Sequence, residues 1–305
     1  MMNPLKVLKN SKKGWAVTRG VMLGSIFSLS LLASVSTATA VNSTSVGEHA
    51  QIATYQLYAG GIHAVEVALN MEYKPQSRYS IEMDAFTKGF LGKLVPWKGK
   101  FESHGWRMKD EDKPEMHQST TTWKDEVEIK TYKYNKDGTF DGLKITEDGV
   151  DKSPEELDQE LVDGTTDALT AAMLVLQNIA EGESCDSSSE VFDGKRRYKM
   201  IFTKKADEML KQTKYNVYEG PSIQCEVEVK PVAGEWHKKP RGWASIQEQG
   251  RERGSLPTIW IAKIDEKGPA VPVKMRVKTD YGTLFMHMTE YKSGDKVLHS
   301  DEVQN

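Results

Sequence analysis

The chain has 305 residues, of which 38% are hydrophobic and 28% are charged, with 24 Gly and 11 Pro. This composition is typical of a globular protein and excludes collagen, a long coiled coil and wholesale disorder. The formal net charge is −3, but residues 1–40 carry five basic residues and no acid, so the remainder has 36 basic and 44 acidic residues, a net charge of −8. A chain of this sign is not expected to bind nucleic acid, because phosphate binding relies on clustered Lys and Arg.

The first forty residues have the three parts of a secretory signal peptide. A basic stretch at residues 6–19 precedes an apolar run at residues 21–33, and small residues end in Ala38-Thr39-Ala40. This order predicts cleavage after Ala40 and export to the periplasm. A retained membrane anchor is the alternative, but a spanning helix needs roughly 20 apolar residues. We therefore expect a single β-rich exported domain over residues 41–305, with no transmembrane segment after cleavage.

Strand patterns dominate the exported part. Apolar and polar residues alternate over residues 63–73, 79–85, 225–229 and 273–277. Strands with one apolar face are typical of antiparallel sheets that pack on one side and face water on the other. The predicted fold class is mainly β, as one strongly curved antiparallel sheet or an open β-barrel with one or two covering helices.

A helical, acidic segment at about residues 147–185 divides two β-rich halves. Residues 153–156 form a capping box, Ser-Pro-Glu-Glu, which predicts the start of a short acidic helix. Residues 167–181 carry an apolar stripe at helical spacing, with a capping residue among 165–167 and Gly182 at the end. Eight acidic residues lie in 147–163. They indicate either a docking face for a basic partner or a divalent cation, or a solvated helix surface.

Two cysteines, Cys185 and Cys225, lie in the exported part. An even number of cysteines in an oxidising compartment predicts one disulfide. Two buried free thiols are the alternative. A metal site is not indicated, because neither cysteine has a histidine within six residues.

Residues 236–260 are the most unusual stretch of the chain. The segment is rich in Trp, Lys and Arg, and basic side chains beside Gly can bind an anion while Trp offers a flat surface to a sugar, an acyl chain or a partner. The candidate ligand- or partner-binding residues are Trp236, Lys238, Lys239, Arg241, Trp243, Arg251, Arg253 and Trp260. In the alternative, the segment is an ordered loop whose Trp residues pack on the sheet and whose Arg residues pair with local acids such as Glu248 and Glu252. If the basic residues pair internally over a longer range, the 147–163 stretch is the expected acidic partner.

The order of several short motifs resembles the domain of unknown function 3108 family of exported proteobacterial proteins. The matching pieces are the segments at residues 55–62, 167–170, 191–198 and 225–234, which read YQLYAGGI, DALT, VFDGKRRY and CEVEVKPVAG. The resemblance covers most of residues 50–291. It implies an exported β-rich domain, and it assigns no catalytic residue because the family has no agreed activity.

Catalytic and cofactor motifs are absent from the sequence, including G-x-S-x-G, H-E-x-x-H, the P-loop and the Rossmann fingerprint. We therefore expect no catalytic residue, no cofactor and no metal. The predicted function is a non-enzymatic envelope protein that binds a lipid-like ligand or an envelope protein partner in the concave face of the barrel. Five methionines add adaptable apolar surface: Met71, Met83, Met275, Met286 and Met288.

The alternative is a hydrolase that acts on an envelope polymer through the 236–260 loop, with Glu248 or Glu252 as the candidate acid. The two functions predict different sites. A cleft with two carboxylates, one of raised pKa, would favour the enzyme, whereas a dry apolar groove would favour the binding protein.

Overall fold

The computed structural model describes residues 50–108, 112–236, 243–279 and 282–299. All of them lie in one compact unit, Ser45–Asn305. The expected signal peptide and its cleavage site after Ala40 lie outside the described residues. Among the helices of the described ranges, none has the length and apolarity needed to cross a membrane.

The described residues form fifteen strands and four helices. The strands are β1 (Ala50–Ala59), β2 (Ile62–Lys74), β3 (Arg78–Thr87), β4 (Trp97–Arg107), β5 (Asp112–Trp123), β6 (Glu126–Tyr134), β7 (Phe140–Glu147), β8 (Val150–Asp151), β9 (Ser187–Phe192), β10 (Arg196–Leu210), β11 (Gly220–Gly234), β12 (Thr258–Ala262), β13 (Val271–Thr279), β14 (Gly282–Ser293) and β15 (Lys296–His299). The helices are α1 (Gly89–Leu94), α2 (Gln159–Val162), α3 (Ala168–Ala180) and α4 (Trp243–Glu252).

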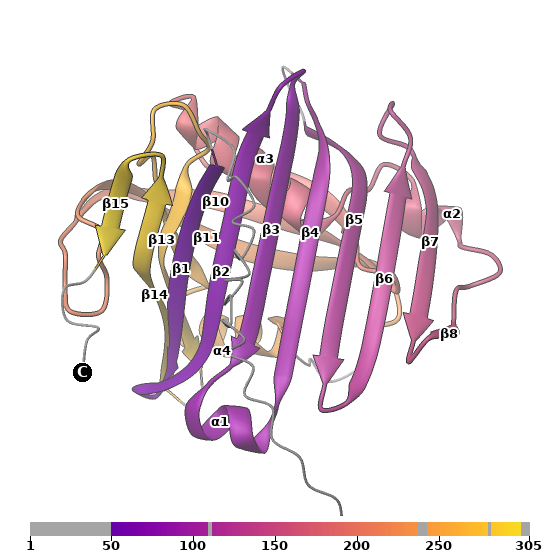
Figure 1. The fold of residues 1–305 in the computed structure, drawn as a ribbon, viewed down its shortest axis with the longest axis horizontal. Helices are drawn as coiled ribbons and strands as arrows, with labels where there is room; N and C mark the ends of the chain where they lie inside the picture. The colour runs from indigo at the N-terminus through magenta and orange to yellow at the C-terminus, as the bar shows by residue number, and fades with distance from the viewer. Residues whose placement is uncertain (1–49, 109–111, 237–242, 280–281, 300–305) are drawn as a thin grey trace, which may run out of the picture. The chain divides into compact units, whose positions relative to one another are not determined.

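All the strands belong to one open antiparallel sheet (Figure 1). Its order is β8-β7-β6-β5-β4-β3-β2-β1-β14-β13-β12-β11-β10-β9, and β15 pairs with β14. Strands β1 and β14, from opposite ends of the fold, pair in the middle of this order, with Gln51 opposite Ser293 and Ala59 opposite Leu284. The expected fold class is confirmed, because the four alternating segments all lie in strands of this sheet.

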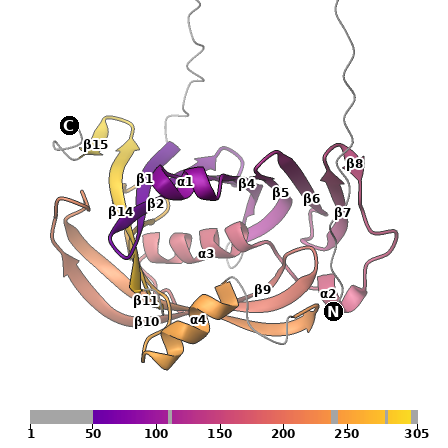
Figure 2. The same cartoon turned by 90° about the horizontal axis from the view of Figure 1, so that it is seen from below.

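Helix α3 lies inside the curve of the sheet. It contacts β3, β4 and β5 from one half of the sheet and β9, β10 and β12 from the other. Figure 2 shows α3 between these two parts, with α4 on the outer side of β10 and β11. The main core therefore joins the apolar stripe of α3, with Met173, Val175 and Leu176, to inward side chains of the sheet such as Met71 and Ile81.

The helix predicted at residues 167–181 is confirmed with a one-residue difference at each end. Asp167 is its N-cap, and its carboxylate Oδ1 accepts hydrogen bonds from the backbone amides of Leu169 and Thr170. Gly182 follows the helix with a φ of 88°, a left-handed conformation that glycine adopts without strain.

The helix predicted from the capping box at residues 153–156 is wrong. The Ser153 hydroxyl accepts a hydrogen bond from the backbone amide of Ile145, so it binds a neighbouring strand instead of a helix terminus. Helix α2 begins later, at Gln159, where Asp158 accepts from the amide of Glu160. Leu157 packs on a small core under β6 and β7, and residues 153–158 are neither helix nor strand.

The disulfide prediction is confirmed. Cys185 and Cys225 are bonded, with Cα atoms 6.5 Å apart, and both are fully buried. The bond joins the segment after α3 to strand β11. It therefore ties the internal helix to the sheet that encloses it.

Candidate functional site

The concave face holds a small apolar cavity between α3 and the sheet. Its volume is about 190 Å³. The lining residues come from α3 and from strands in both halves of the sheet, and they are Tyr55, Val67, Leu69, Ile81, Met83, Leu169, Ala172, Val175, Leu176, Phe202, Ile259, Ile261, Pro272, Met275 and Met286. No charged or amide side chain is among them, so the cavity meets the description of a dry apolar groove.

A buried polar network at the N-terminus of α3 fixes the helix against the sheet. The Asp167 carboxylate accepts hydrogen bonds from the hydroxyls of Ser103 on β4, at 2.7 Å, and Thr170, at 2.6 Å. The Thr170 hydroxyl also lies 2.7 Å from the Tyr79 hydroxyl on β3. Because buried polar groups need partners, these bonds specify how deep α3 sits and therefore how much space remains beside Leu169 and Ala172.

Among the described residues that line the cavity, Tyr55 contributes the only hydroxyl. Its side chain is 1% exposed, and its oxygen has no hydrogen-bond partner within the described part of the chain. Burial, reinforced by nearby Tyr291, raises the pKa of Tyr55 far above its usual value, so the hydroxyl stays protonated. A buried hydroxyl without a partner costs about 1–3 kcal/mol, but this oxygen is out of contact with solvent, so a ligand in the cavity does not reach it.

Three of the five methionines singled out from the sequence lie together in the cavity wall. Met83 comes from β3, Met275 from β13 and Met286 from β14. The other two, Met71 and Met288, are completely buried in the core. The flexible thioether side chain can adjust to ligands of differing shape.

The tryptophans of residues 236–260 are placed apart. Trp260 is buried on β12, and its indole Nε1 donates to Glu208 at 2.6 Å. Trp236 follows β11, and its indole Nε1 donates to the backbone oxygen of Ala233. The Arg196 guanidinium lies 5.0 Å from the centre of its ring. Trp243 is the first residue of α4. The segment is therefore partly a helix and not the long loop that the sequence indicated.

The basic residues of the same segment show internal pairing where they are described. Arg251 bonds Glu228 at 2.7 Å and Glu248 at 2.9 Å, and Arg253 donates to the backbone oxygen of Gln249. Lys238, Lys239 and Arg241 lie outside the described residues.

The described contacts of residues 236–260 do not join the tryptophans and the basic residues into one site. Gln247 holds α4 against β11 by two hydrogen bonds to the backbone of Val229. The pairing of Arg251 with a local acid agrees with the ordered-loop alternative. The acidic partners of Arg251 in the described structure, Glu228 and Glu248, lie outside the 147–163 stretch.

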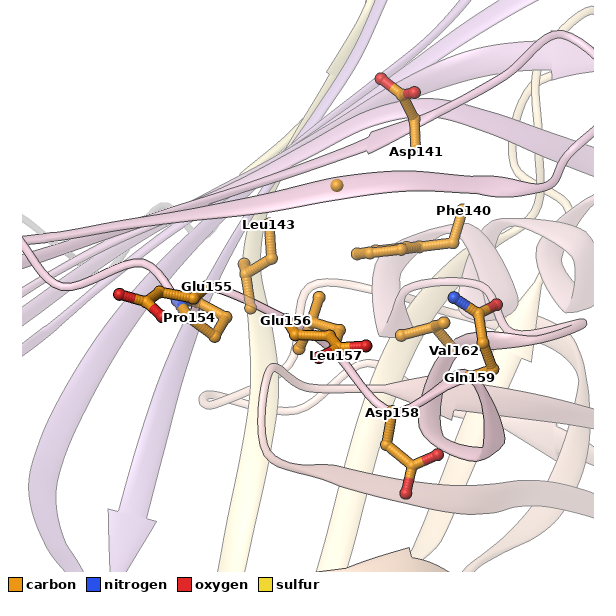
Figure 3. A pocket seen from close by; sticks show the side chains of 11 residues that line it. Phe140, Asp141, Leu143, Pro154, Glu155, Glu156, Leu157, Asp158, Gln159 and Val162 are labelled. Carbon is orange, nitrogen blue, oxygen red and sulfur yellow. The ribbon is translucent and has the colours of Figure 1, made fainter.

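The acidic stretch borders a hollow of about 870 Å³ (Figure 3). Phe140 and Leu143 of β7 line one side, and residues 154–159 line the other. Glu155, Glu156 and Asp158 are exposed to solvent. In Figure 3 the Asp141 carboxylate points away from the hollow. The acids therefore do not converge on one point, and the hollow offers no preformed cation site among the residues that line it.

A second polar hollow, of about 460 Å³, contains a carboxyl group of raised pKa. Burial raises the pKa of Asp112 to about 7, against the opposing effect of the nearby Arg107 guanidinium. Glu190 lines the same hollow, and its hydrogen bond to Arg197 lowers its pKa. Two carboxyl groups with separated pKa values are typical of acid–base sites. However, both oxygens of Asp112 are out of contact with solvent, so a substrate in the hollow does not reach them.

These observations define a class of protein: an open antiparallel sheet curled around one helix, with an apolar cavity between them. The sequence profile of the family described as "Protein of unknown function (DUF3108)" matches residues 54–289, and the chain belongs to this family. The resemblance seen in the sequence motifs is therefore confirmed.

Comparison with solved structures finds similarity to the β-barrel-like protein of domain of unknown function DUF1849 from Brucella abortus. The two share 10% sequence identity over 81% of this chain and 99% of that chain, with a TM-score of 0.47. No curated protein matches the chain.

Proposed function

We propose that this protein is a periplasmic, non-enzymatic binding protein that holds a lipid-like ligand in the cavity between α3 and the sheet. The observation that carries the proposal is the composition of the lining, in which none of the described residues is charged or carries an amide. Ligand sites are usually concave and mostly apolar, with a few polar groups that orient the ligand. The cavity has the concave, apolar wall of such a site.

The size of the cavity supports a short apolar group. Its volume of about 190 Å³ exceeds the roughly 150 Å³ of an apolar protein cavity that binds benzene. A complete lipid does not fit in this space. The proposed ligand therefore inserts one end of an acyl chain or a small apolar ring.

Export supports the same proposal. The basic, apolar and small-residue order of residues 1–40 is that of a secretory signal, and the Cys185–Cys225 bond is stable in an oxidising compartment. An exported protein lies beside the lipids and lipid precursors of the cell envelope. A ligand with an acyl chain is therefore available to it there.

Filling the cavity is expected to weaken ligand binding. Ala172→Phe places an aromatic ring where the lining has a methyl group, and we expect at least a tenfold loss of decanoate affinity because the ring occupies the ligand's volume. The measurement is a ¹³C-methyl methionine NMR titration. Decanoate should shift the signals of Met83, Met275 and Met286, which line the cavity, and leave that of Met209, which is 67% exposed elsewhere.

The matched control is Ala206→Phe, which adds the same ring at an exposed position of β10. This variant should bind decanoate as the unaltered protein does. Equal shifts of Met209 and the three lining methionines, or full binding by Ala172→Phe, would overturn the proposal. If the proposal holds, native mass spectrometry of protein purified gently from its own host would identify the natural ligand by its mass.

The hydrolase remains the weaker candidate. Its support is the pair formed by Asp112 and Glu190 in one hollow, but the buried Asp112 oxygens do not face a substrate. The candidate acid Glu248 forms an ion pair with Arg251 on the surface of α4. A protein partner is the other alternative for the concave face, but α3 already lies there.

A further inference from the structure

One end of the sheet exposes large apolar side chains around helix α1. Phe90 and Leu94 are 70% and 60% exposed, and α1 has no buried residue. Ile62, which is 64% exposed, begins β2 at the same end, since Val65 of β2 pairs with Thr87 just before α1. Figure 1 shows α1 projecting beyond the strands at this end. Large apolar side chains gathered in this way indicate an interaction surface.

Hydrogen bonds hold both ends of the segment that contains α1 against the sheet. The amide of Lys88 donates to the carbonyl of Ala64 at 2.9 Å. The Thr87 hydroxyl donates to the carbonyl of Val95 and accepts from the amide of Trp97, so it clamps the two ends of the segment together. Phe90 and Leu94 are four residues apart and therefore share one face of the helix. The face they share is exposed to solvent, and neither side chain is part of the described hydrophobic core.

The segment that carries Phe90 and Leu94 is basic. Residues 85–101 contain four lysines and no acid. Lys88 pairs with Glu66 and Lys100 pairs with Glu102. The exposed Lys93 and Lys98 form no ion pair among the described residues. Two unneutralised lysines therefore flank the apolar face of α1 in a chain whose exported part has a net negative charge.

We infer that this surface, which we call the α1 surface (Ile62, Phe90, Lys93, Leu94 and Lys98), docks the protein on an anionic lipid surface. Exposed Phe and Leu side chains beside lysines are the combination by which interfacial helices bury their apolar face at the headgroup level while basic groups meet anionic lipids. The half-buried Trp97 just after α1 and Trp123 opposite it add aromatic side chains at the same end, where membrane interfaces favour them.

Charge complementarity favours a lipid surface over a second copy of this chain. Another copy would present the same two lysines, and like charges would face each other across a two-fold interface. The inference does not depend on the cavity, because α1 and the cavity lining have no residue in common. The protein would dock in this way even if decanoate did not bind.

Insertion of α1 is measured directly by tryptophan quenching. Phe90→Trp places an indole at the centre of the α1 surface, and Met209→Trp places one at an equally exposed site on β10. With vesicles of phosphatidylethanolamine and phosphatidylglycerol that carry brominated acyl chains, we expect the fluorescence added by the Phe90→Trp substitution to be quenched at least threefold more strongly than that added by the control, since only inserted indoles meet the bromine atoms. Equal quenching of both variants would overturn the inference.

Vesicle sedimentation with the full chain separates the apolar and the charged contributions. Phe90→Ser with Leu94→Ser should weaken partitioning at least tenfold, whereas Met209→Ser with Val232→Ser, two exposed apolar residues elsewhere, should leave it within twofold. Lys93→Gln with Lys98→Gln should weaken binding to phosphatidylglycerol vesicles about fivefold per lysine and leave phosphatidylcholine vesicles unaffected. The apolar run at residues 21–33 can itself bind vesicles, but it is the same in all variants. Differences in partitioning between variants are therefore due to the substituted residues.

Two results would contradict the docking surface. One is unchanged partitioning of the Phe90→Ser, Leu94→Ser variant. The other is a dimer of the unaltered protein in solution that this variant converts to a monomer, because the α1 surface would then be an interface between copies.

Discussion

Replacing Cys185 and Cys225 together by Ala is expected to lower the free energy of unfolding by about 4 kcal/mol. The bond closes a loop across a sequence separation of 40 residues, and the loop-entropy relation gives about 3.9 kcal/mol for a loop of this length. The effect arises in the unfolded chain, which gains freedom once the link is removed. Equilibrium urea unfolding, followed by circular dichroism, measures it.

The single variants provide the control. Cys185→Ala and Cys225→Ala each remove the same bond, so each alone should cost nearly as much as the double variant. Two free thiols would instead give independent, smaller losses that add. A reducing agent should lower the stability of the unaltered protein to that of the double variant and leave the double variant unchanged, and a failure of that convergence would contradict the disulfide.

Replacing Asp112 by Asn is expected to raise stability at pH 8 by up to about 4 kcal/mol. Burial raises the pKa of the carboxyl from 3.8 to about 7 in the folded protein, and each pKa unit corresponds to about 1.36 kcal/mol. Between these values the unfolded chain has released the proton and the folded protein retains it. The contribution of Asp112 to stability therefore falls as the pH rises from about 4 to about 7.

Other groups also make the free energy of unfolding depend on pH, so the effect of Asp112 is the difference between the unaltered protein and Asp112→Asn. The groups that act on Asp112 are Arg107, which favours its charged form, and Glu181, which opposes it. Burial, with a smaller effect of Lys274, lowers the pKa of His287, so its contribution to stability rises with pH and partly masks that of Asp112. Urea unfolding should show that Asp112→Asn is more stable than the unaltered protein by a larger margin at pH 8 than at pH 5. The control Asp125→Asn, which alters an exposed turn, should show no such difference between the two pH values. A gap between the unaltered protein and Asp112→Asn that is equal at both pH values would refute the titration.

The proposed ligand cavity and the proposed docking surface are independent of each other. In the two proposals, the cavity holds a short apolar group within the sheet, and α1 places one end of the sheet on the lipid headgroups. Each proposal has its own measurement, so a failure of decanoate binding leaves the docking surface standing. The reverse also holds, because the methionine shifts are measured without vesicles.

The sequence by itself determined the local elements. Alternation over residues 63–73 and 79–85 predicted β2 and β3, because side chains in a strand alternate between faces whatever else the chain does. The stripe of residues 167–181, a capping residue and Gly182 predicted α3 for the same local reason. The disulfide followed from two cysteines and an export signal. The apolar stripe also contained Leu169 and Ala172 of the cavity, without showing what they face.

Only the tertiary structure decided which of these elements meet. Met83, Met275 and Met286 come from strands at opposite ends of the chain, and the pairing of β1 with β14 brings them to one cavity. The position of α3 inside the curve depends on bonds of Asp167 to a strand far away in sequence. Ser153 shows the limit of local patterns. The capping box usually indicates a helix start, but here the Ser153 hydroxyl accepts a hydrogen bond from the backbone amide of the strand residue Ile145. The contacts of the three methionines and of Asp167 follow from how the whole sheet curls around its helix, and local spacing carries no information about them.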